Sequence, residues 1–409
     1  MIAAERTRRD APIAACPLDR YHCAMTTPGP TSGNPDLIAV IRAVIADAGG
    51  RIPFAHYMAL ALTHSVYGYY ASGRGAPGRD GADFLTAPET TPYFGRCLAV
   101  QVAECWRLLG APAAFTVWEH GAGAGTLART LLDALREIAP GAYAVTTYWL
   151  DDVSFPTLAR ARSAVAAHEN HVAWGAPTTG IIGVVLANEF VDALPVHRIR
   201  IEDGDLREAF VRWDADRTVF TEEWGTPSTL ALAERIAAEG VMLQEGQIAE
   251  VCLATTPWIA GIAHRLEAGY VVVIDYGDVA PALYRPGRFP EGSLMCYFRH
   301  TANRAPFLRL GEQDMTAHVD FTMLVHAANR AGLTTLGLTT QAAFLASLGL
   351  GEMLYTATQH ATDAVRYITE RNAVVRLIEP SAMGRNRVLL LGKDVPMEPR
   401  PCGLTEPPI

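Results

Sequence analysis

The most informative stretch of the chain reads Val117-Trp118-Glu119-His120-Gly121-Ala122-Gly123-Ala124-Gly125-Thr126-Leu127. The apolar residues 115–118 predict a buried strand, and residues 126–138 carry apolar side chains at helical spacing. Between them, glycines at alternate positions let the backbone approach a ligand closely, and the helix N-terminus offers unpaired N–H groups. This order of strand, glycine turn and helix predicts a nucleotide-binding site, with a ligand-free turn as the alternative.

The spacing of this turn discriminates between nucleotides. The dinucleotide fingerprint requires its third glycine where Thr126 stands, and a phosphate-binding P-loop requires a lysine, whereas the one lysine of the chain is Lys393. An acid followed by alternating glycines is instead the pattern of S-adenosylmethionine-dependent methyltransferases. In that pattern Glu119 faces the amino acid part of the cofactor, and the three glycines let the backbone wrap around it. A solvent-facing strand end is the alternative for Glu119.

The composition bounds the class of protein. Of the 409 residues, 50% are hydrophobic, enough for the core of one elaborated α/β domain or of two or three domains. The formal net charge is −9 without a basic stripe, which argues against nucleic acid as the main partner. Seven cysteines without a C-x-x-C pair predict reduced thiols in a cytoplasmic protein, and no cluster has the spacing of a metal site. No apolar run approaches the roughly 18 residues of a membrane span.

Acidic residues follow successive apolar segments that predict buried strands. Residues 144–150 end at Asp151-Asp152, residues 183–187 at Asn188-Glu189, and residues 270–274 at Asp275. These segments alternate with helical patterns, which predicts a doubly wound α/β sheet. Ligands of such sheets bind beyond the carboxyl ends of the strands. We therefore expect these acids and Glu119 to converge on one pocket.

Four regions are predicted along the chain. Residues 1–34 form a disordered extension, and residues 35–110 form a helical segment that includes a glycine-rich loop ending near Asp83, Thr86 and Glu89. Residues 111–395 form the core of the protein. Within it, residues 196–220 alternate in polarity and predict a β-ribbon insertion. Residues 396–409 form a disordered tail.

Several strings of the sequence resemble the MidA-like methyltransferase family. The resemblance covers roughly residues 35–350 and implies a Rossmann-like class I methyltransferase sheet with added helical segments and S-adenosylmethionine as cofactor. The mitochondrial members are complex I assembly arginine methyltransferases, so the resemblance to that branch implies ω-N-methylation of a protein arginine. The matching strings are Gly81-Ala82-Asp83-Phe84-Leu85-Thr86-Ala87-Pro88-Glu89, residues 119–127, residues 188–196, Asp275-Tyr276-Gly277 and Thr316-Ala317-His318-Val319-Asp320-Phe321.

The resemblance also implies residues that hold the cofactor. The loop with Asp83, Thr86 and Glu89 closes over it, and Asp152 accepts hydrogen bonds from the ribose hydroxyls. The segment after the second strand is one residue longer than in the family. Asp151 is therefore the alternative ribose ligand, with Asp152 capping a helix.

The loop after the central strand is the predicted place of methyl transfer. Positioning is the main contribution that a protein makes to such a displacement. Glu189 and Asp192, beside Asn188, have the chemistry to hold a planar guanidinium by paired hydrogen bonds and to accept its proton. One aromatic of the family is lost here, because Phe190 is followed by Val191. A turn cap is the alternative for Asp192.

Three further polar residues have open roles. His318 and Asp320 are a base with its orienting acid, a substrate-binding pair, or a packed histidine beside a helix N-cap. Asp275 borders the substrate channel or caps its strand. We include His318 among the candidate catalytic residues.

The sequence favours an S-adenosylmethionine-dependent methyltransferase that N-methylates an arginine of a partner protein, such as a respiratory-complex subunit. The alternatives are a methyltransferase acting on oxygen or nitrogen of a small molecule, and a non-catalytic assembly factor that keeps the cofactor fold. An NAD-dependent dehydrogenase is disfavoured by the missing third glycine. The oligomeric state is left open.

Overall fold

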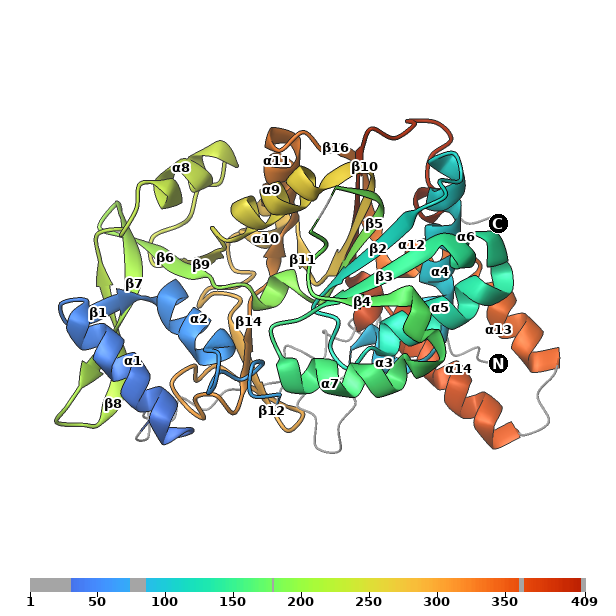
Figure 1. Cartoon of the computed structure of the whole chain (residues 1–409). Helices are drawn as coiled ribbons and strands as arrows, with labels where there is room; N and C mark the ends of the chain where they lie inside the picture. The colour runs from blue at the N-terminus through green and yellow to red at the C-terminus, as the bar shows by residue number, and fades with distance from the viewer. Residues whose placement is uncertain (1–30, 74–85, 179, 360–363, 406–409) are drawn as a thin grey trace, which may run out of the picture.

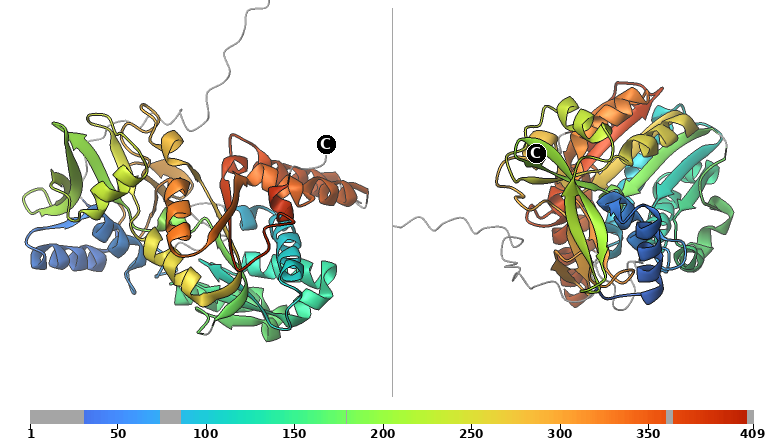
Figure 2. Two further views of the ribbon diagram at one scale, coloured as in Figure 1. Left: turned by 90° about the horizontal axis from the view of Figure 1, so that it is seen from above. Right: turned by 90° about the vertical axis from the view of Figure 1, so that its left-hand side faces the viewer.

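The computed structural model describes residues 31–73, 86–178, 180–359 and 364–405. Two lobes lie side by side in Figure 1: an antiparallel sheet with α1 and α2 at the left, and a seven-stranded sheet between helices at the right. Figure 2 shows the same two lobes from above and from the end. Strands alternate with helices along most of the chain, so the predicted α/β class is confirmed.

The seven-stranded sheet has the order β16-β17-β10-β5-β2-β3-β4. Its neighbours pair in parallel except for β17, which runs against both β10 and β16. The chain continues from β2 to β3 on one side and later to β5 on the other, so the crevice for a ligand lies beyond the carboxyl end of β2. The strands are β2 (Phe115–His120), β3 (Thr146–Asp151), β4 (Val172–Trp174), β5 (Ile181–Asn188), β10 (Leu266–Asp275), β16 (Thr334–Thr340) and β17 (Arg387–Lys393).

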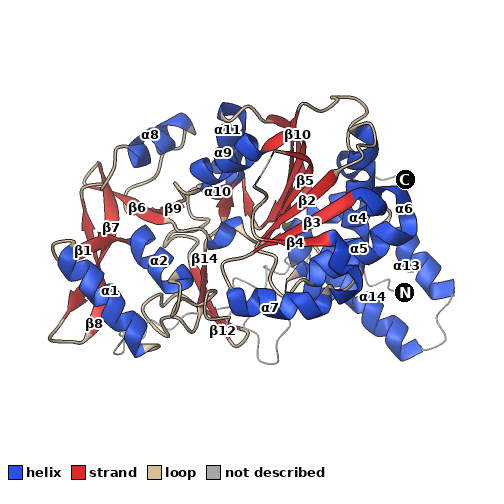
Figure 3. Ribbon diagram, in the orientation of Figure 1, coloured by secondary structure: helices blue, strands red, loops and turns tan. Residues whose placement is uncertain are grey.

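Helices cover both faces of this sheet, as Figure 3 shows. The central strands β5 and β10 are nearly continuous apolar runs because both of their faces are buried. One face packs on α4 (Tyr93–Leu108), α5 (Thr126–Ile138), α7 (Phe155–Ala164), α12 (Gln341–Ser347) and α14 (Ala364–Ile378). The other face packs on α9 (Thr255–Arg265) and α11 (Phe321–Arg330). The helix predicted at residues 126–138 is confirmed to the residue.

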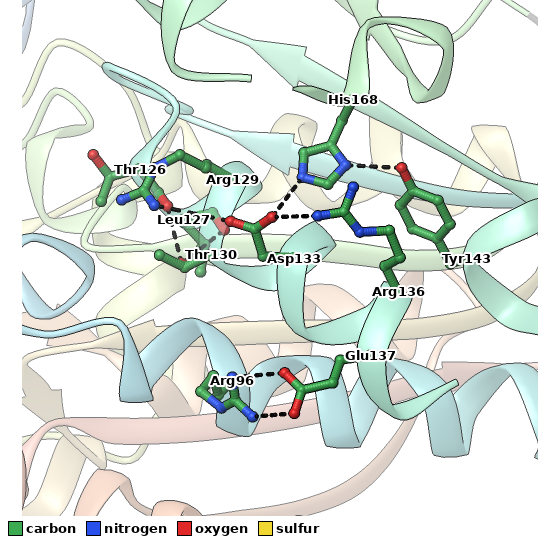
Figure 4. A network of polar contacts seen from close by, with 10 residues as sticks. All are labelled: Arg96, Thr126, Leu127, Arg129, Thr130, Asp133, Arg136, Glu137, Tyr143 and His168. Atoms are coloured by element: carbon green, nitrogen blue, oxygen red, sulfur yellow. Dashed lines mark hydrogen bonds and ion pairs between the residues drawn. The ribbon is translucent and has the colours of Figure 1, made fainter. Parts of the chain in front are cut away.

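A polar network fixes α5, the helix that follows the glycine turn (Figure 4). Arg96 on α4 donates two hydrogen bonds, of 3.0 and 3.1 Å, to the two carboxylate oxygens of Glu137. Asp133 contacts the buried His168, whose other ring nitrogen lies 2.8 Å from the Tyr143 hydroxyl. These contacts tie α5 to α4, to α6 (Pro140–Val145) and to the turn before β4. The direction of α5, and with it the place of its N-terminus, is therefore set from several sides.

The second lobe is an antiparallel sheet of order β1-β7-β6-β9, with β8 paired to β7. The β-ribbon predicted at residues 196–220 is part of this sheet, since β6, β7 and the start of β8 lie within it. Two apolar clusters fill the lobe, one under α1 and α2 and one under α8 and α10. The elements are α1 (Pro35–Asp47), β1 (Arg51–Pro53), α2 (Phe54–Thr63), β6 (His197–Glu202), β7 (Asp205–Asp214), β8 (Val219–Gly225), α8 (Ala231–Ala238), β9 (Ile248–Val251) and α10 (Ala280–Leu283).

The lobes do not follow the predicted boundary at residue 110. Ile52 of β1 pairs with Val211 of β7, because both strands bury one face on the same apolar cluster. Helix α4, by contrast, belongs to the face of the large sheet. The N-terminal segment is thus shared between the lobes. Its first helix is capped by Asn34, whose side chain accepts from the N–H groups of Asp36 and Leu37.

Short strands connect the lobes. In a three-stranded sheet of order β13-β12-β14, strand β14 lies next to α2, whereas the pair β11-β15 lies beside α10 and α11, closer to the large sheet (Figure 1). They are β11 (Gly277–Asp278), β12 (Met295–Phe298), β13 (Thr301–Asn303), β14 (Asp314–Thr316) and β15 (Val319–Asp320). The helices not yet named are α3 (Ala87–Thr90) and α13 (Leu350–Gln359).

The predicted disordered tail at 396–409 is wrong for the part that the structure describes. The Cys402 and Gly403 N–H groups donate to Glu104 and Gln101 of α4, at 2.7 and 3.0 Å. Gln101 is fully buried and needs partners for its amide, which holds this segment in place. The five cysteines within the described ranges are free thiols. None of the helices in those ranges is long and apolar enough to cross a membrane.

Candidate active site

A cavity of about 640 Å³ opens beyond the carboxyl ends of β2, β3 and β5. We call the part built by the loops after β2 and β3 the sheet wall: Glu119, His120, Gly121, Ala122, Gly123, Thr126, Leu127, Asp151, Asp152, Val153, Ser154 and Thr157. The insert wall is Thr63, Tyr70, Tyr276, Tyr297, Asp314 and Thr316. Residues 188–190 and 192–195 lie at the cavity too, as do Thr86, Pro88 and Glu89.

The glycine turn brings backbone to the cavity. Gly121 has φ +67°, and a Cβ at this position would lie 2.9 Å from the Phe190 ring, so a larger residue cannot be accommodated without movement. Gly121 and Gly123 line the cavity, as the sequence predicts. Gly125 does not: it precedes α5, and a Cβ there would meet Ala161 of α7 at 3.1 Å. Its role is the close packing of two helices.

Glu119, the residue before the last of β2, has its carboxyl group buried at the cavity. The Tyr148 hydroxyl donates to Oε2 at 2.8 Å. Burial raises the pKa of Glu119 to about 8, the nearby Asp152 raises it further, and the Tyr148 hydrogen bond opposes the shift. A cationic group beside Glu119 would favour its ionised form, so the site fits an ammonium group.

Asp151, the last residue of β3, and Asp152, the residue after it, both lie at the cavity, but their carboxylates are held differently. Asp152 accepts from the Gly123 N–H at 2.9 Å and from the Ser154 N–H at 2.8 Å, which ties it to the glycine turn. Asp151 accepts from the Trp118 indole at 3.3 Å, on the opposite face of the sheet. The helix cap of α7 is Ser154, not Asp152. Of these two acids, Asp152 is therefore better placed to accept hydrogen bonds from the hydroxyl groups of a ligand bound at the glycine turn.

The loop predicted to close over the cofactor is described only in part. Asp83 lies outside the described residues. Thr86 is buried and Glu89 half-buried, and both line the cavity. The Ala87 N–H between them donates to Glu189 Oε1 at 3.0 Å. This bond joins the end of the loop to the segment after β5.

The segment after β5 carries the predicted catalytic acids. Glu189 has φ +48°, a left-handed conformation that costs energy in a residue with a side chain, and its N–H donates to Ile274 O at 2.8 Å. Burial raises the pKa of Glu189 to about 7, and the Ala87 hydrogen bond opposes this. Asn188 Nδ2 lies 3.4 Å from Glu189 Oε1. Burial likewise raises the pKa of Asp192 to about 6.

Asp275 lies beneath this segment and does not line the cavity. Its Oδ2 accepts from the N–H groups of Phe190, Val191 and Asp192, at 3.2, 2.9 and 3.2 Å, and its Oδ1 accepts from the Tyr276 N–H at 2.9 Å. Four donors on one buried carboxylate fix the backbone that presents Asp192 and Tyr276. Of the two roles considered for Asp275, capping its own strand describes only the bond from Tyr276, because the other three donors belong to the loop after β5.

His318 and Asp320 lie away from the cavity. The His318 ring packs on Tyr276 and Phe289, with centroids 5.1 and 4.7 Å apart, and burial lowers its pKa to about 3. Asp320 accepts from the Met323 N–H and caps α11. The structure therefore places His318 with the apolar packing and not with Asn188, Glu189 and Asp192.

The sequence did not single out most of the insert wall. Tyr70 comes from the turn after α2, and its hydroxyl donates to Asp314 Oδ1 at 2.6 Å across 244 residues of chain. Tyr276 and Thr316 stand inside the quoted strings, which was a usable signal. Nothing in the pattern around Tyr297 marks it. On the sheet wall, His120 was also missed; burial lowers its pKa to about 4, and its ring packs on Trp118, Phe190 and Trp258.

The charge of the cavity is one-sided. Among the described residues that line it, none is lysine or arginine, whereas seven are acids: Glu89, Glu119, Asp151, Asp152, Glu189, Asp192 and Asp314. Over the described ranges, no group of three or more His, Cys, Asp or Glu could hold a metal ion. This cavity favours a ligand that carries positive charge.

Known proteins share this chain's sequence and fold. A solved structure from Burkholderia thailandensis, bound to S-adenosyl-homocysteine, is 33% identical to this chain in sequence. The alignment covers 89% of this chain and 95% of the solved chain, with a TM-score of 0.82. A native structure matches at 32% identity, 91% and 96% coverage, and a TM-score of 0.80. The predicted class I methyltransferase sheet and S-adenosylmethionine as cofactor are thereby confirmed.

Several curated proteins named as mitochondrial arginine methyltransferases are similar to this chain. The Drosophila melanogaster protein named "Protein arginine methyltransferase NDUFAF7 homolog, mitochondrial" is 28% identical over 86% of this chain and 84% of its own length. The Homo sapiens protein arginine methyltransferase NDUFAF7, mitochondrial, is 27% identical over 74% and 70%. The prediction of a cytoplasmic location is wrong by this comparison, because the absence of disulfide and membrane signals cannot separate the cytoplasm from an organelle.

A family model described as "Putative S-adenosyl-L-methionine-dependent methyltransferase" matches residues 97–339, more than half of the chain. The match includes the glycine turn, the segment after β5 and the strings at residues 275–277 and 316–321. It agrees with the resemblance to the MidA-like family seen in the sequence. The chain belongs to this family of S-adenosylmethionine-dependent methyltransferases.

Proposed function

We propose that the protein methylates a side-chain nitrogen of an arginine in a partner protein. The observation that carries this proposal is the charge of the cavity, which has acids on every side and no lysine or arginine among its described lining residues. An arginine side chain remains a cation at any physiological pH, so a methyltransferase for it needs buried carboxylates near the acceptor. The names of the curated relatives support the same substrate class.

The sheet wall suits S-adenosylmethionine. When bound, this cofactor would supply a methyl group from its sulfonium sulfur. The sulfur would be the leaving group and would keep the electron pair of the broken bond. Glu119 would bind the ammonium of the cofactor's amino acid part, and this cation would in turn favour the ionised form of the acid, whose pKa burial raises to about 8 in the free protein. Asp152, held by the Gly123 and Ser154 N–H groups, would accept from ribose hydroxyls. Gly121 and Gly123 leave room for the ligand beside the backbone.

The loop before the core contributes at the edge of this wall. Thr86 and Glu89 line the cavity next to Glu189, and we assign them, with Asp83, to binding of the cofactor. Their contribution is to exclude water once the ligand is bound.

Asn188, Glu189 and Asp192 would orient the acceptor nitrogen. The two carboxylates hold the guanidinium by charge-assisted hydrogen bonds, and one of them takes the proton that the nitrogen loses as its new bond to carbon forms. Their pKa values, about 7 and about 6, are near the range in which a general base works well. The strained φ of Glu189 is consistent with a side chain held for a task rather than for stability.

The experiment is methylation with labelled S-adenosylmethionine of an extract from the cells that express the protein, followed by mass spectrometry of labelled products. We expect label on arginine of a polypeptide, and a respiratory-complex subunit is the first candidate to examine. Glu189→Gln should abolish labelling and spare cofactor binding. Glu234→Gln, an exposed site on α8, is the matched control and should act as wild type.

The same experiment separates the alternatives. Label on small molecules would support a metabolite methyltransferase, and label on a lysine would refute the arginine acceptor. Full retention of labelling in Glu189→Gln would refute the assignment of that carboxylate. Cofactor binding without any labelled product would favour a non-catalytic assembly factor.

A further inference from the structure

Three buried polar atoms at the insert wall and beside it make no hydrogen bond of good geometry among the described residues: Asp192 Oδ1, the Tyr276 hydroxyl and the Thr316 hydroxyl. They lie close to one another, since the Tyr276 hydroxyl opposes the rise in the pKa of Asp192 and the Thr316 hydroxyl opposes the rise in the pKa of Tyr276. All three residues line the cavity, and Asp192 and Thr316 are only 5% and 3% exposed. A buried polar group left unpaired destabilises the folded protein. His120 Nε2 and Asn188 Oδ1 at the same cavity are also unpaired, but the three atoms named first lie together at the insert wall and beside it and indicate a place where a ligand completes the hydrogen bonds.

The backbone holds these three groups in a fixed relation. Asp192 O accepts from the Ala317 N–H at 2.9 Å, which joins the turn after β5 to the residue that follows Thr316. Tyr276 O accepts from the Val319 N–H at 3.0 Å, next to the pairing of β11 with β15. Asp275 anchors the chain on either side, through the N–H groups of Asp192 and Tyr276. The unpaired atoms are therefore presented by a rigid frame, which lowers the entropic cost of binding.

A second carboxylate on the insert wall is also fixed in place. Asp314 Oδ1 accepts from the Tyr70 hydroxyl at 2.6 Å and from the Met315 N–H at 2.8 Å. In the pairing of β12 with β14, Asp314 stands opposite Tyr297. The insert wall thus combines a held carboxylate with three phenol rings, from Tyr70, Tyr276 and Tyr297.

We propose that Asp192, Tyr276 and Thr316 form the subsite for the guanidinium of the methyl acceptor, with Asp314, Tyr70 and Tyr297 enclosing its side chain. This inference rests on the proposed function and names the residues that select the acceptor. A guanidinium carries five N–H donors in one plane and no acceptor, which matches a carboxylate oxygen flanked by two hydroxyls. It is weakly hydrated and stacks on aromatic rings, whereas an ammonium is compact and strongly hydrated. The subsite therefore favours arginine over lysine.

The test is calorimetry on the full-length protein saturated with S-adenosylhomocysteine. The probes are N-acetyl-arginine amide and the citrulline analogue, which has nearly the same shape and no charge. We expect the citrulline probe to bind at least tenfold more weakly than the arginine probe. Asp192→Asn should weaken the arginine probe by about 10- to 100-fold, and Thr316→Val and Tyr276→Phe by about fivefold each.

Stability separates binding from a structural role. Thr316→Val and Tyr276→Phe remove hydroxyls that make no hydrogen bond of good geometry in the free protein, so its Tm should change little. Thr146→Val is the matched control: this threonine is as buried as Thr316, but its hydroxyl donates to Ala142 O at 2.7 Å. That variant should lose stability and bind the arginine probe as wild type does. All variants should bind S-adenosylhomocysteine normally.

The outcomes distinguish this inference from the proposed function. Equal binding of the arginine probe by wild type, Thr316→Val and Tyr276→Phe would overturn the subsite, even if label from S-adenosylmethionine is found on protein arginine. Failure of the arginine probe to bind wild type would overturn it too. Weakened binding in the three variants, with label found only on other acceptors, would uphold the subsite and refute the proposed reaction.

Discussion

Replacing Glu119 by glutamine should change stability and cofactor affinity in opposite directions. The substitution keeps the shape of the side chain and leaves an amide oxygen to accept from Tyr148, but it removes the buried charge. Burial raises the pKa of Glu119 from 4.5 to about 8. Between these values the folded protein keeps a proton on Glu119 that the unfolded chain has released.

The sign and size of the effect on stability follow from this difference in bound protons. Because the folded state binds the extra proton, the contribution of Glu119 to the free energy of unfolding is fully present below pH 4.5. It is lost as the pH rises towards 8, by about 1.4 kcal/mol per pH unit. From pH 5.5 to 7.5, Glu119 should lower the free energy of unfolding by about 2.5 kcal/mol. Glu119→Gln does not titrate, so its advantage over wild type should grow by this amount over the same range.

Urea unfolding of the cofactor-free protein at several pH values measures this difference, with Glu234→Gln as the surface control. In the same variant, calorimetry at pH 7.5 should show cofactor binding weakened by about 10- to 100-fold, since a charge-assisted contact to the ammonium is lost. Parallel pH profiles for wild type and Glu119→Gln would refute the assigned burial of a titrating carboxyl. Unchanged cofactor affinity would refute its assigned partner.

Three further outcomes are expected. Gly121→Ala should weaken cofactor binding at least tenfold, because the new Cβ would meet Phe190 at 2.9 Å. The control is Gly204→Ala, at a similar φ of +78° with open space around it, which should cost only about 1–2 kcal/mol of stability and leave cofactor binding intact. Equal cofactor affinities of the two variants would contradict this prediction. The kcat of wild type should rise with pH through about 7, because Glu189 must lose its proton to act as a base, and a flat profile would exclude that role. Asp275→Asn places an NH2 group against N–H donors, so urea unfolding should show a free energy of unfolding lower by about 3 kcal/mol or more. Steady-state kinetics of the same variant should show a fall in kcat larger than any change in cofactor affinity.

The features that could be predicted from the sequence are those carried by contiguous residues. The strand, glycine turn and helix at residues 115–138 form one local unit, and its order alone predicts a nucleotide cradle. Acids directly after apolar runs can be placed at the carboxyl edge of a parallel sheet by topology. Glu119, Asp152 and Glu189 lie at one cavity for that reason.

Features that depend on contacts between distant segments could not be predicted. Tyr70 and Asp314 meet across 244 residues, and neither position shows a periodic pattern that would pair them. The strand β1 is too short to be recognised, and its pairing with β7 joins segments that the predicted boundary at residue 110 separates. Pairing of this kind depends on the shared apolar cluster, which exists only in the folded protein.

His318 shows how a rare string misleads about a single residue. Its neighbours in sequence resemble family motifs, but its ring is packed on Tyr276 and Phe289, where burial disfavours the charged form. The string is explained instead by backbone contacts of Ala317 and Val319, which hold the loop after β5 and the chain after β10. A motif can therefore mark a framework in which only some side chains, such as that of Thr316, reach the cavity.

The division of the cavity into two walls bears on how such an enzyme acquires new substrates. Five of the six insert-wall residues belong to segments that contribute no strand to the seven-stranded sheet, Tyr276 being the exception. Randomising those five positions would therefore leave the methyl-donor pocket and the folding of the large sheet largely undisturbed. Gene duplicates built on this scaffold have the same freedom to exchange one acceptor for another, and a designer could retarget the enzyme by the same route.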